Sequence, residues 1–279
     1  MKILLTGGTG FIGSYTYKEL RKMGHEVQLF KGDIAKTSDW QKNLKGGETI
    51  FLIAGVRTET DIDFAVNTDS IKKLFEIAVR EQKLPKRLIL ASSQAVYMGN
   101  VAPFNESQEP LPTTTYGQSK LLGERIAEDL CREFGIPLVI FRYSTVLGKG
   151  VREKSKMSGP LFIWTKAALN NAPMKVFQDG NQSRDYIHVG DVASANILAI
   201  DLPSGVYNVG GGESVRLIEL VNWIKEASGS SSEVVILGGE SSKSDPREML
   251  SDTAKIKSYG WKTLKSAKEA VLEFVASLK

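Results

Sequence analysis

The sequence of 279 residues predicts an α/β protein with a doubly wound parallel sheet, followed by a smaller C-terminal α/β region. Short apolar runs alternate with helical patterns through the first half, a glycine-rich turn joins the first run to the first helix, and the pattern loosens after Gly148. Such alternation is typical of parallel sheets that helices cover on both faces. We expect one region over residues 1–148 and a second over 149–279, with a segment near 188–205 returning to the first.

Five short apolar runs are expected to be the strands, because each is bounded by a turn. They are KILLT (2–6), EVQLF (26–30), TIFLIA (49–54), RLILAS (87–92) and PLVIFRY (137–143). Ser38 followed by Gln41 forms a capping-box pattern that predicts the start of a short helix. Two longer helices, near 68–82 and 117–134, are predicted from apolar stripes of helical spacing: Ile71, Leu74, Phe75 and Ala78, then Leu122, Ile126, Leu130 and Phe134.

Composition excludes several classes of function. Lys and Arg number 36 against 32 Asp and Glu, without a run of five like charges, so neither nucleic-acid binding nor a membrane-surface patch is expected. No apolar segment approaches the length of a membrane span. The single cysteine, Cys131, cannot form an internal disulfide, which favours a reducing compartment such as the cytoplasm. His25 and His188 lack ligand-like neighbours, so no metal site is expected.

The glycine turn TGGTGFIG predicts a dinucleotide site. It follows the strand KILL and leads into a helix that begins near Phe11, so unpaired backbone N–H groups would point at one place, where a pyrophosphate binds. Gly7, Gly10 and Gly13 would let backbone approach phosphate and helix approach strand. The spacing is GxxGxxG, which resembles that of short-chain dehydrogenases.

The segment YGQSK predicts a catalytic pair. Tyr116 and Lys120 are four residues apart, hence on one face of a helix. The segment SSQAVYM, with Ser93, follows strand RLILA at the edge where open α/β sheets bind ligands. A free tyrosine has a pKa of about 10, and a nearby positive charge favours its phenolate, which can then act as a base near neutrality.

Taken in order, these motifs resemble the extended short-chain dehydrogenase/reductase family, specifically its NAD(P)-dependent nucleotide-sugar epimerase/dehydratase branch. The matching segments are TGGTGFIG, LIAG, VNTDS with Asn67, SSQAVY, YGQSK, FRYSTVLG, DGNQSRDYIHVGDVA, YNVGGG and SDTAKIKSYGW, which together span essentially the whole chain. The resemblance implies a Rossmann-type fold, NAD or NADP as cofactor, a nucleotide-diphosphate sugar as substrate and a C-terminal substrate-binding region.

The resemblance also implies a role for each matching residue. Tyr116 would be the catalytic base, Lys120 would bind the nicotinamide ribose and tune the phenol, and Ser93 would bond the reacting sugar oxygen. Tyr143 would lie near the nicotinamide carboxamide. The full cofactor set would be Gly7, Gly10, Phe11, Ile12, Gly13, Lys31, Asp33, Ile34, Ala54, Gly55, Arg57, Asn67, Tyr116, Lys120 and Tyr143. The substrate set would be Ser93, Thr145, Arg184 and Arg247, with both arginines facing the diphosphate.

Departures from the family pattern narrow the reaction. Dehydratases of this branch carry Asp-Glu directly after the catalytic hydroxyl, whereas this chain has Gln94 and Ala95, so dehydration and decarboxylation are both disfavoured. Thr145 replaces the usual Asn, and Ser242 stands where an Arg is usual. Both changes fall in the expected nucleotide-sugar pocket and suggest an unusual substrate.

The stretch after the second strand is shortened. Family members run through a helix and an edge strand before a GD-hydrophobic turn, but here EVQLF enters GDI almost at once. Asp33 and Ile34 are therefore the expected adenine contacts. Lys31 replaces the carboxylate that usually binds the adenosine ribose, and a cation there would favour NADP if it faces the ribose. If the side chain of Lys31 points to solvent instead, NAD would bind through other groups. Both alternatives stay open.

The expected activity is a nucleotide-sugar epimerisation at C4 through a transient keto intermediate. The alternatives are an NAD(P)H-dependent 4-ketosugar reductase, which would use the same three side chains, and a non-catalytic dinucleotide-sensing protein on the same fold. By resemblance, the two long helices would form a homodimer interface. Their charged outer faces leave a monomer open.

Overall fold

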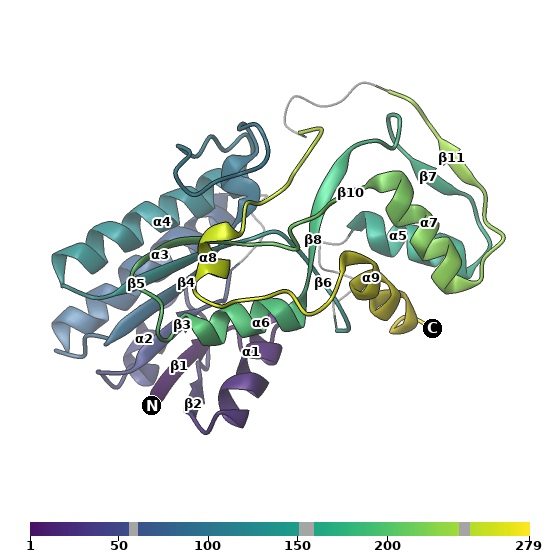
Figure 1. Ribbon diagram of the computed structural model, residues 1–279. Helices are drawn as coiled ribbons and strands as arrows, with labels where there is room; N and C mark the ends of the chain where they lie inside the picture. Colours follow the sequence, from purple (N-terminus) through teal and green to yellow (C-terminus); the bar gives the residue numbers. More distant parts are fainter. Residues whose placement is uncertain (56–60, 151–158, 240–245) are drawn as a thin grey trace.

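The computed structural model describes residues 1–55, 61–150, 159–239 and 246–279. Its centre is a six-stranded sheet of order β2-β1-β3-β4-β5-β9, in which every neighbouring pair is parallel (Figure 1). The strands are β1 (Lys2–Thr6), β2 (Glu26–Leu29), β3 (Thr49–Leu52), β4 (Arg87–Ser93), β5 (Leu138–Tyr143) and β9 (Gly205–Val209). All five predicted runs form strands of this sheet, which confirms the doubly wound α/β prediction.

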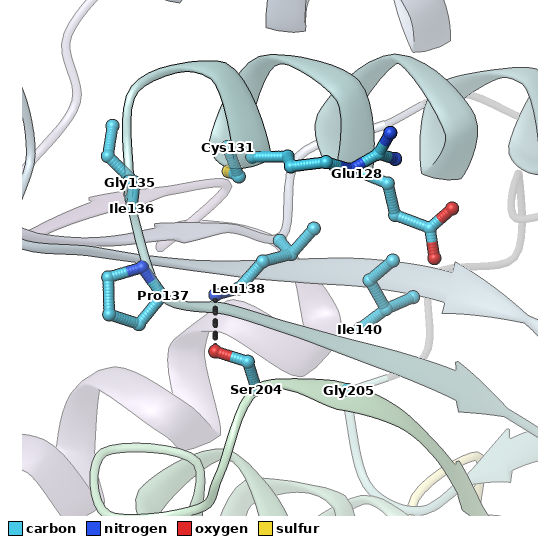
Figure 2. Close-up of a pocket in the computed structure, with 10 residues that line it drawn as sticks. Glu128, Cys131, Gly135, Ile136, Pro137, Leu138, Ile140, Ser204 and Gly205 are labelled. Atoms are coloured by element: carbon cyan, nitrogen blue, oxygen red, sulfur yellow. Dashed lines mark hydrogen bonds between the residues drawn. The ribbon is translucent and has the colours of Figure 1, made fainter.

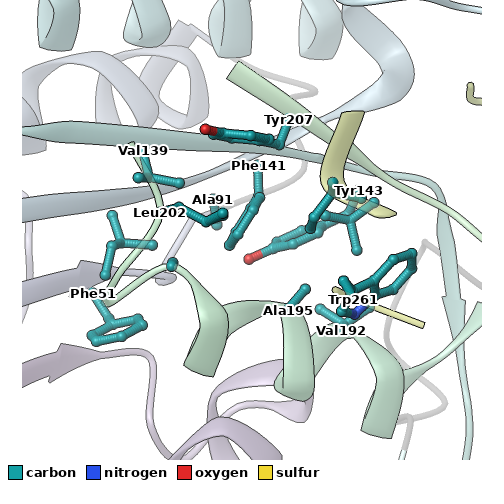
Figure 3. Close-up of a cluster of buried hydrophobic side chains, with 14 of the residues drawn as sticks. Phe51, Ala91, Val139, Phe141, Tyr143, Val192, Ala195, Leu202, Tyr207 and Trp261 are labelled. Carbon is teal, nitrogen blue, oxygen red and sulfur yellow. The ribbon is translucent and has the colours of Figure 1, made fainter. Parts of the chain in front are cut away.

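Helices cover both faces of the sheet (Figure 1). On one face lie α1 (Phe11–Lys22) and α6 (Val189–Leu198), and on the other lie α2 (Thr37–Asn43), α3 (Asp61–Arg80) and α4 (Thr115–Glu133). The apolar core between the sheet and α1 and α6 is here called the first core, and the core between the sheet and α2, α3 and α4 is called the second. Successive side chains of a strand point to opposite faces, so Ile3 and Leu5 enter the first core while Leu4 enters the second. Figure 3 shows the first core, which contains Phe51 and Phe141 of the sheet and Val192 of α6.

The smaller region is built from short strands and helices. β6 (Thr145–Leu147) pairs in parallel with β8 (Ser183–His188), and β8 pairs antiparallel with β10 (Ser214–Arg216). A second, parallel pair joins β7 (Met174–Val176) to β11 (Val234–Ile236). Around one apolar core lie α5 (Gly159–Leu169), α7 (Leu217–Ser228) and α9 (Ala267–Ala276), as Figure 1 shows on the side away from β2.

Between β8 and β10 the chain returns to the large sheet. α6 packs on α1 in the first core, and β9 then pairs with β5 at the sheet edge. Near the other end of the chain, α8 (Ala254–Ser258) contacts β9. The division into residues 1–148 and 149–279 remains our proposal, and the position of α6 and β9 supports the expected return near 188–205.

One helix start differs from its prediction. The capping box at Ser38 and Gln41 is wrong, because α2 begins at Thr37 and its N-cap residue, Lys36, makes no side-chain cap bond. The two longer helices begin and end within a few residues of their predicted bounds, apart from the earlier start of α3 at Asp61. In the part of the chain that the structure describes, no helix combines the length and apolar character that crossing a bilayer requires.

A buried ion pair joins α4 to β5. Glu124 and Arg142 are 1% and 4% exposed, and two guanidinium nitrogens of Arg142, Nε and Nη2, lie 2.5–3.2 Å from the carboxylate oxygens of Glu124. Ser92 of β4 also donates to this carboxylate, and Arg142 donates to the hydroxyl of Tyr97 in the 3₁₀ helix η1 (Gln94–Tyr97). The pair therefore ties α4, β4, β5 and η1 together.

We predict that Glu124→Gln lowers the free energy of unfolding by about 3 kcal/mol, because it leaves the Arg142 charge buried without its partner. Arg132→Ala is the matched control, since it breaks the exposed Arg132–Asp129 pair, whose side chains are 75% and 73% exposed. That control is expected to change the free energy of unfolding by less than about 0.5 kcal/mol. Denaturant unfolding of both variants checks this, and equal losses would contradict it.

Candidate active site

The glycine turn between β1 and α1 leaves no space for a side chain at Gly7 or Gly13. Gly7 has φ +68°, and a Cβ on it would lie 2.9 Å from the backbone nitrogen of Ala54. A Cβ on Gly13 would lie 2.1 Å from the carbonyl oxygen of Gly7. Gly10 is the N-cap of α1, and its N–H donates to Gly7 at 2.8 Å. The start of α1, with Phe11 and Ile12, is therefore held directly beyond the end of β1, where a helix N-terminus stabilises a phosphate.

A pocket of about 400 Å³ opens beside this turn. Its volume lies in the range of ligand-binding clefts. It brings together predicted cofactor residues from the ends of three strands, and its lining is Gly7, Gly8, Thr9, Leu29, Phe30, Gly32, Asp33, Ile34, Ala54, Gly55 and Val66. A glycine-lined turn at a helix N-terminus beside a pocket of this size fits the adenosine half of a dinucleotide.

Five of the predicted cofactor residues belong to this lining: Gly7, Asp33, Ile34, Ala54 and Gly55. Lys31 is exposed and lies outside the pocket, although its neighbours Phe30 and Gly32 line it. Arg57 lies outside the described residues.

The predicted catalytic hydroxyl lies at the carboxyl end of β4. Ser93 is the last residue of β4 and the N-cap of η1, and its Oγ accepts the N–H of Ala95 at 3.2 Å. The first turn of α4 lies against η1, because a Cβ on Gly117 would lie 2.4 Å from the carbonyl oxygen of Ala95. Tyr116 directly precedes this close contact. The structure therefore holds the backbones around Ser93 and Tyr116 beside each other.

Lys120 reaches the carboxyl ends of two strands. Its Nζ donates to the carbonyl of Ala91 in β4 at 3.2 Å, and it lies 2.9 Å from the position that a Cβ on Gly55 would occupy, just beyond β3. The same nitrogen is 5.9 Å from the ring centroid of Tyr116. Burial lowers the pKa of Lys120 to about 8, while Glu124, one turn further along α4, opposes that shift.

Asn67 of α3 belongs to the same cluster. Its Nδ2 donates to the hydroxyl of Ser119 at 3.1 Å, and that hydroxyl donates to the carbonyl of Tyr116 at 2.8 Å. Its Oδ1 lies 3.1 Å from the position of a Cβ on Gly55. Asn67 thus links α3, α4 and the end of β3 around the Tyr116–Lys120 pair.

The phenol of Tyr143 points away from the Tyr116–Lys120 cluster and toward α6. It is buried, and its hydroxyl donates to Oδ1 of Asn196 in α6 at 2.7 Å, as Figure 3 places it on the α6 side of the sheet. Burial raises its pKa. The backbone of Tyr143 pairs with Ser93 across β4 and β5, so its main chain borders the cluster while its side chain enters the core.

The predicted substrate residues lie in or next to the smaller region. Thr145 begins β6, opposite Tyr186 of β8. The Nη1 of Arg184 in β8 donates to the carbonyls of Ser183 at 2.7 Å and Pro246 at 3.0 Å. Arg247 pairs with Asp179 at 2.7 Å and is two-thirds exposed. Both arginines therefore have protein partners in this structure, and the diphosphate role stays a prediction for each.

A buried polar contact joins the two regions near the site. The hydroxyl of Ser251 donates to Oε1 of Gln94 at 3.2 Å, and the N–H of Ser251 donates to the carboxylate of Asp185 at 3.1 Å. Asp185 also accepts the N–H of Gly211 at 2.7 Å, and burial raises its pKa to about 6. Sequence reasoning missed Asp185 and Ser251, and their spacing along the chain carries no signal of this contact.

A larger cavity of about 670 Å³ lies away from this cluster (Figure 2). It is lined by Cys131 near the end of α4, by Leu138 and by Gly205, which begin β5 and β9. Figure 2 shows the hydroxyl of Ser204 beside Leu138, whose N–H it accepts at 3.1 Å. Ligands of open parallel sheets bind at the carboxyl ends of the strands. This cavity lies at the amino ends, so we do not assign it to the site.

The fold and the cluster define an enzyme of the short-chain dehydrogenase type, and comparison with known proteins specifies the family. Residues 3–210 match the NAD dependent epimerase/dehydratase family, and the chain belongs to that family. A protein of Methanocaldococcus jannaschii, provisionally named a UDP-glucose 4-epimerase, is 30% identical over 99% of this chain and 98% of its own length. The predicted family is therefore confirmed.

Solved structures of 4-epimerases share the whole fold. The UDP-glucose 4-epimerase of Thermotoga maritima, solved with UDP-glucose, has a TM-score of 0.89 at 26% identity, over 100% of this chain and 98% of that one. The UDP-glucuronic acid 4-epimerase of Bacillus cereus, in complex with UDP-glucuronic acid and NAD, has a TM-score of 0.86 at 25% identity, over 100% and 99%. These likenesses confirm the predicted fold class.

We predict that Gly55→Ala lowers kcat while it changes the free energy of unfolding only slightly. The added Cβ would lie 2.9 Å from the Lys120 ammonium, which must move away from the carbonyl of Ala91. Because the clash is with the end of a flexible side chain, the free energy of unfolding should fall by about 1 kcal/mol or less. Turnover and thermal melting of the same preparation check this, and wild-type kcat in the folded variant would contradict it.

Proposed function

We propose that this protein is an NAD-dependent nucleotide-sugar 4-epimerase. The observation that carries the proposal is the position of Lys120, whose ammonium bonds the main chain of β4, lies close to Gly55 just beyond β3 and is 5.9 Å from the ring centroid of Tyr116. The glycine turn and its pocket also lie at the carboxyl ends of the strands. Whole-chain likeness to 4-epimerases of two different sugars supports the same reaction class.

Each side chain of the cluster has one task in this proposal. NAD, held at the glycine turn, would supply the reversible hydride acceptor for the sugar C4. Tyr116 removes the proton of the C4 hydroxyl and later returns it. Lys120 holds positive charge beside the phenol and so favours its phenolate. Ser93 hydrogen-bonds the reacting sugar oxygen.

The residues around the cluster favour epimerisation over elimination. Gln94 is an amide, 3% exposed, whose oxygen is engaged by Ser251, and Ala95 has no functional group. Neither can act as the acid or base that loss of water requires. A UDP-sugar is the proposed substrate, because the solved 4-epimerases above contain UDP-glucose and UDP-glucuronic acid. Arg184, Arg247 and Thr145 are the residues that we propose to contact it.

The reductase stays the second candidate. Lys31 replaces the carboxylate that usually binds the adenosine ribose, and a cation there would favour NADP, which suits a reductase. The two activities differ in stoichiometry. An epimerase turns over without added reductant, whereas a reductase consumes one NAD(P)H for each sugar reduced. The homodimer through α3 and α4 and the cytoplasmic location stay predictions.

We predict that the wild-type protein with NAD interconverts a UDP-hexose and its C4 epimer without net change in NADH absorbance. Tyr116→Phe should lower kcat by roughly 100-fold or more, because the proton has no acceptor, while NAD binding is kept. Chromatography of the sugar nucleotides with parallel absorbance at 340 nm checks both. Consumption of NAD(P)H in proportion to product would replace the epimerase with the reductase, and undiminished turnover of the variant would contradict the proposed base.

The choice of dinucleotide is tested at Lys31. Its side chain lies outside the pocket that its neighbours line, so we favour NAD and predict that Lys31→Asp changes the ratio of NAD to NADP affinity by less than about twofold. Calorimetric titration of both dinucleotides into wild type and variant checks this. A fall of about fivefold or more in NADP affinity relative to NAD would show that the lysine faces the ribose phosphate.

A further inference from the structure

The short helix α2 holds the loop that follows β2, here called the ribose loop (residues 30–34), through three side chains on one helix face. Asp39, Trp40 and Asn43 are spaced i, i+1 and i+4, which places them on one side of α2. Trp40 and Asn43 are buried, and Asp39 is largely so. Each of these side chains bonds the main chain of the ribose loop.

The side chain of Asn43 makes hydrogen bonds of the kind that the backbone of a neighbouring strand would make. Its Oδ1 accepts the N–H of Lys31 at 2.9 Å, and its Nδ2 donates to the carbonyl of the same residue at 2.9 Å. One side-chain amide thus satisfies both backbone groups of a residue at the sheet edge. The carbonyl of Asn43 also accepts from Gln28 of β2 at 2.9 Å. Because β2 is the last strand on this side of the described sheet, no backbone of a further strand could make these bonds.

The next two loop positions are held in the same way. Asp39 accepts the N–H of Asp33 at 2.9 Å, and Trp40 donates to the carbonyl of Ile34 at 2.8 Å. Gly32 between them has φ +115°, and a Cβ on it would lie 2.4 Å from the carboxylate of Asp39. Only glycine suits this position, so the loop backbone is tightly determined.

The other side of the same loop faces the dinucleotide pocket. Phe30, Gly32, Asp33 and Ile34 all line it, together with Gly7 and Ala54. Asp39, Trp40 and Asn43 do not line it. The three helix residues therefore act on any ligand only through the ribose loop. A loop that is ordered before binding spares the ligand the entropic cost of ordering it.

We propose that Asn43 and Asp39 are positioning residues that hold the ribose loop in its binding conformation for the adenosine half of the dinucleotide. The proposal rests on the proposed function, since it assumes that a dinucleotide binds in this pocket. It also accounts for the shortened stretch after β2: a helix of seven residues replaces the backbone partners that a further strand would supply.

The test compares NAD affinity in Asn43→Ala and in a matched control. Asn43→Ala should raise the NAD dissociation constant about tenfold, the size expected for loss of the two bonds to Lys31 that hold the binding conformation. The variant also loses a third bond, from Nδ2 to the carbonyl of Asp39 within α2. kcat at saturating NAD should stay within about twofold of wild type, because the Tyr116–Lys120 cluster is untouched. Calorimetric titration of nucleotide-free protein and steady-state kinetics measure the two quantities.

Asn100→Ala is the control, because Asn100 also accepts one backbone N–H, from Leu111 at 3.0 Å, and donates to one carbonyl, that of Glu109 at 3.0 Å. It removes a like pair of bonds from a loop that does not line the pocket. Its NAD dissociation constant should stay within about twofold of wild type. An equal rise in both variants would reduce the effect at Asn43 to general destabilisation and overturn the proposal.

Hydrogen exchange of the wild type provides a test that does not depend on a variant that folds. The amides of Lys31 and Asp33 donate to the side chains of Asn43 and Asp39, so they should exchange slowly before NAD is added. Exchange at the rate of an unstructured peptide until NAD binds would overturn the proposal. Wild type that binds no dinucleotide would sink the proposed function itself, whereas wild-type affinity in Asn43→Ala would sink the positioning role alone.

Discussion

The position of α4 over the carboxyl ends of β3 and β4 is the constraint on which the rest of the site depends. Gly117, Lys120 and Glu124 share one face of this helix and each contacts a different element. Gly117 lies against η1, Lys120 bonds the main chain of β4, and Glu124 pairs with Arg142 of β5. Three consecutive turns are therefore fixed, and the orientation of Tyr116 follows from them.

The electrostatics of this helix face serve the proposed chemistry. Taking an ammonium out of water favours its neutral form, which would remove the charge that a phenolate needs beside it. Glu124, itself buried and bonded by Arg142, acts in the opposite direction on Lys120. With a pKa of about 8, Lys120 is mostly charged at neutral pH and loses that charge as the pH rises above 8. The buried ion pair thus both holds α4 and supports the cation one turn away.

Local patterns were sufficient for the sheet and for the main elements of the site. In the glycine turn and in the YGQSK segment, the residue types and their spacing within a few positions predict the role. Both segments lie at the carboxyl ends of the strands, as predicted. Glu124 follows Lys120 by one helical turn, and this spacing is a signal in the sequence that the two side chains lie on one face of α4. Contacts between distant segments carried none: Asn43 meets Lys31 through a turn with no motif, and Ser251 meets Gln94 across 157 positions. The direction of Tyr143 depends on which face of β5 it occupies, and its hydroxyl bonds Asn196 of α6 on that face.

A crystal structure of the complex with NAD and a UDP-hexose tests the central claim most directly. We expect the hydroxyl of Tyr116 and the Oγ of Ser93 to lie within about 3 Å of the sugar 4-oxygen, with Lys120 Nζ on the nicotinamide ribose and the adenosine half between the ribose loop and Ala54. A dinucleotide bound elsewhere, or a sugar whose C4 faces away from Tyr116, would contradict the account.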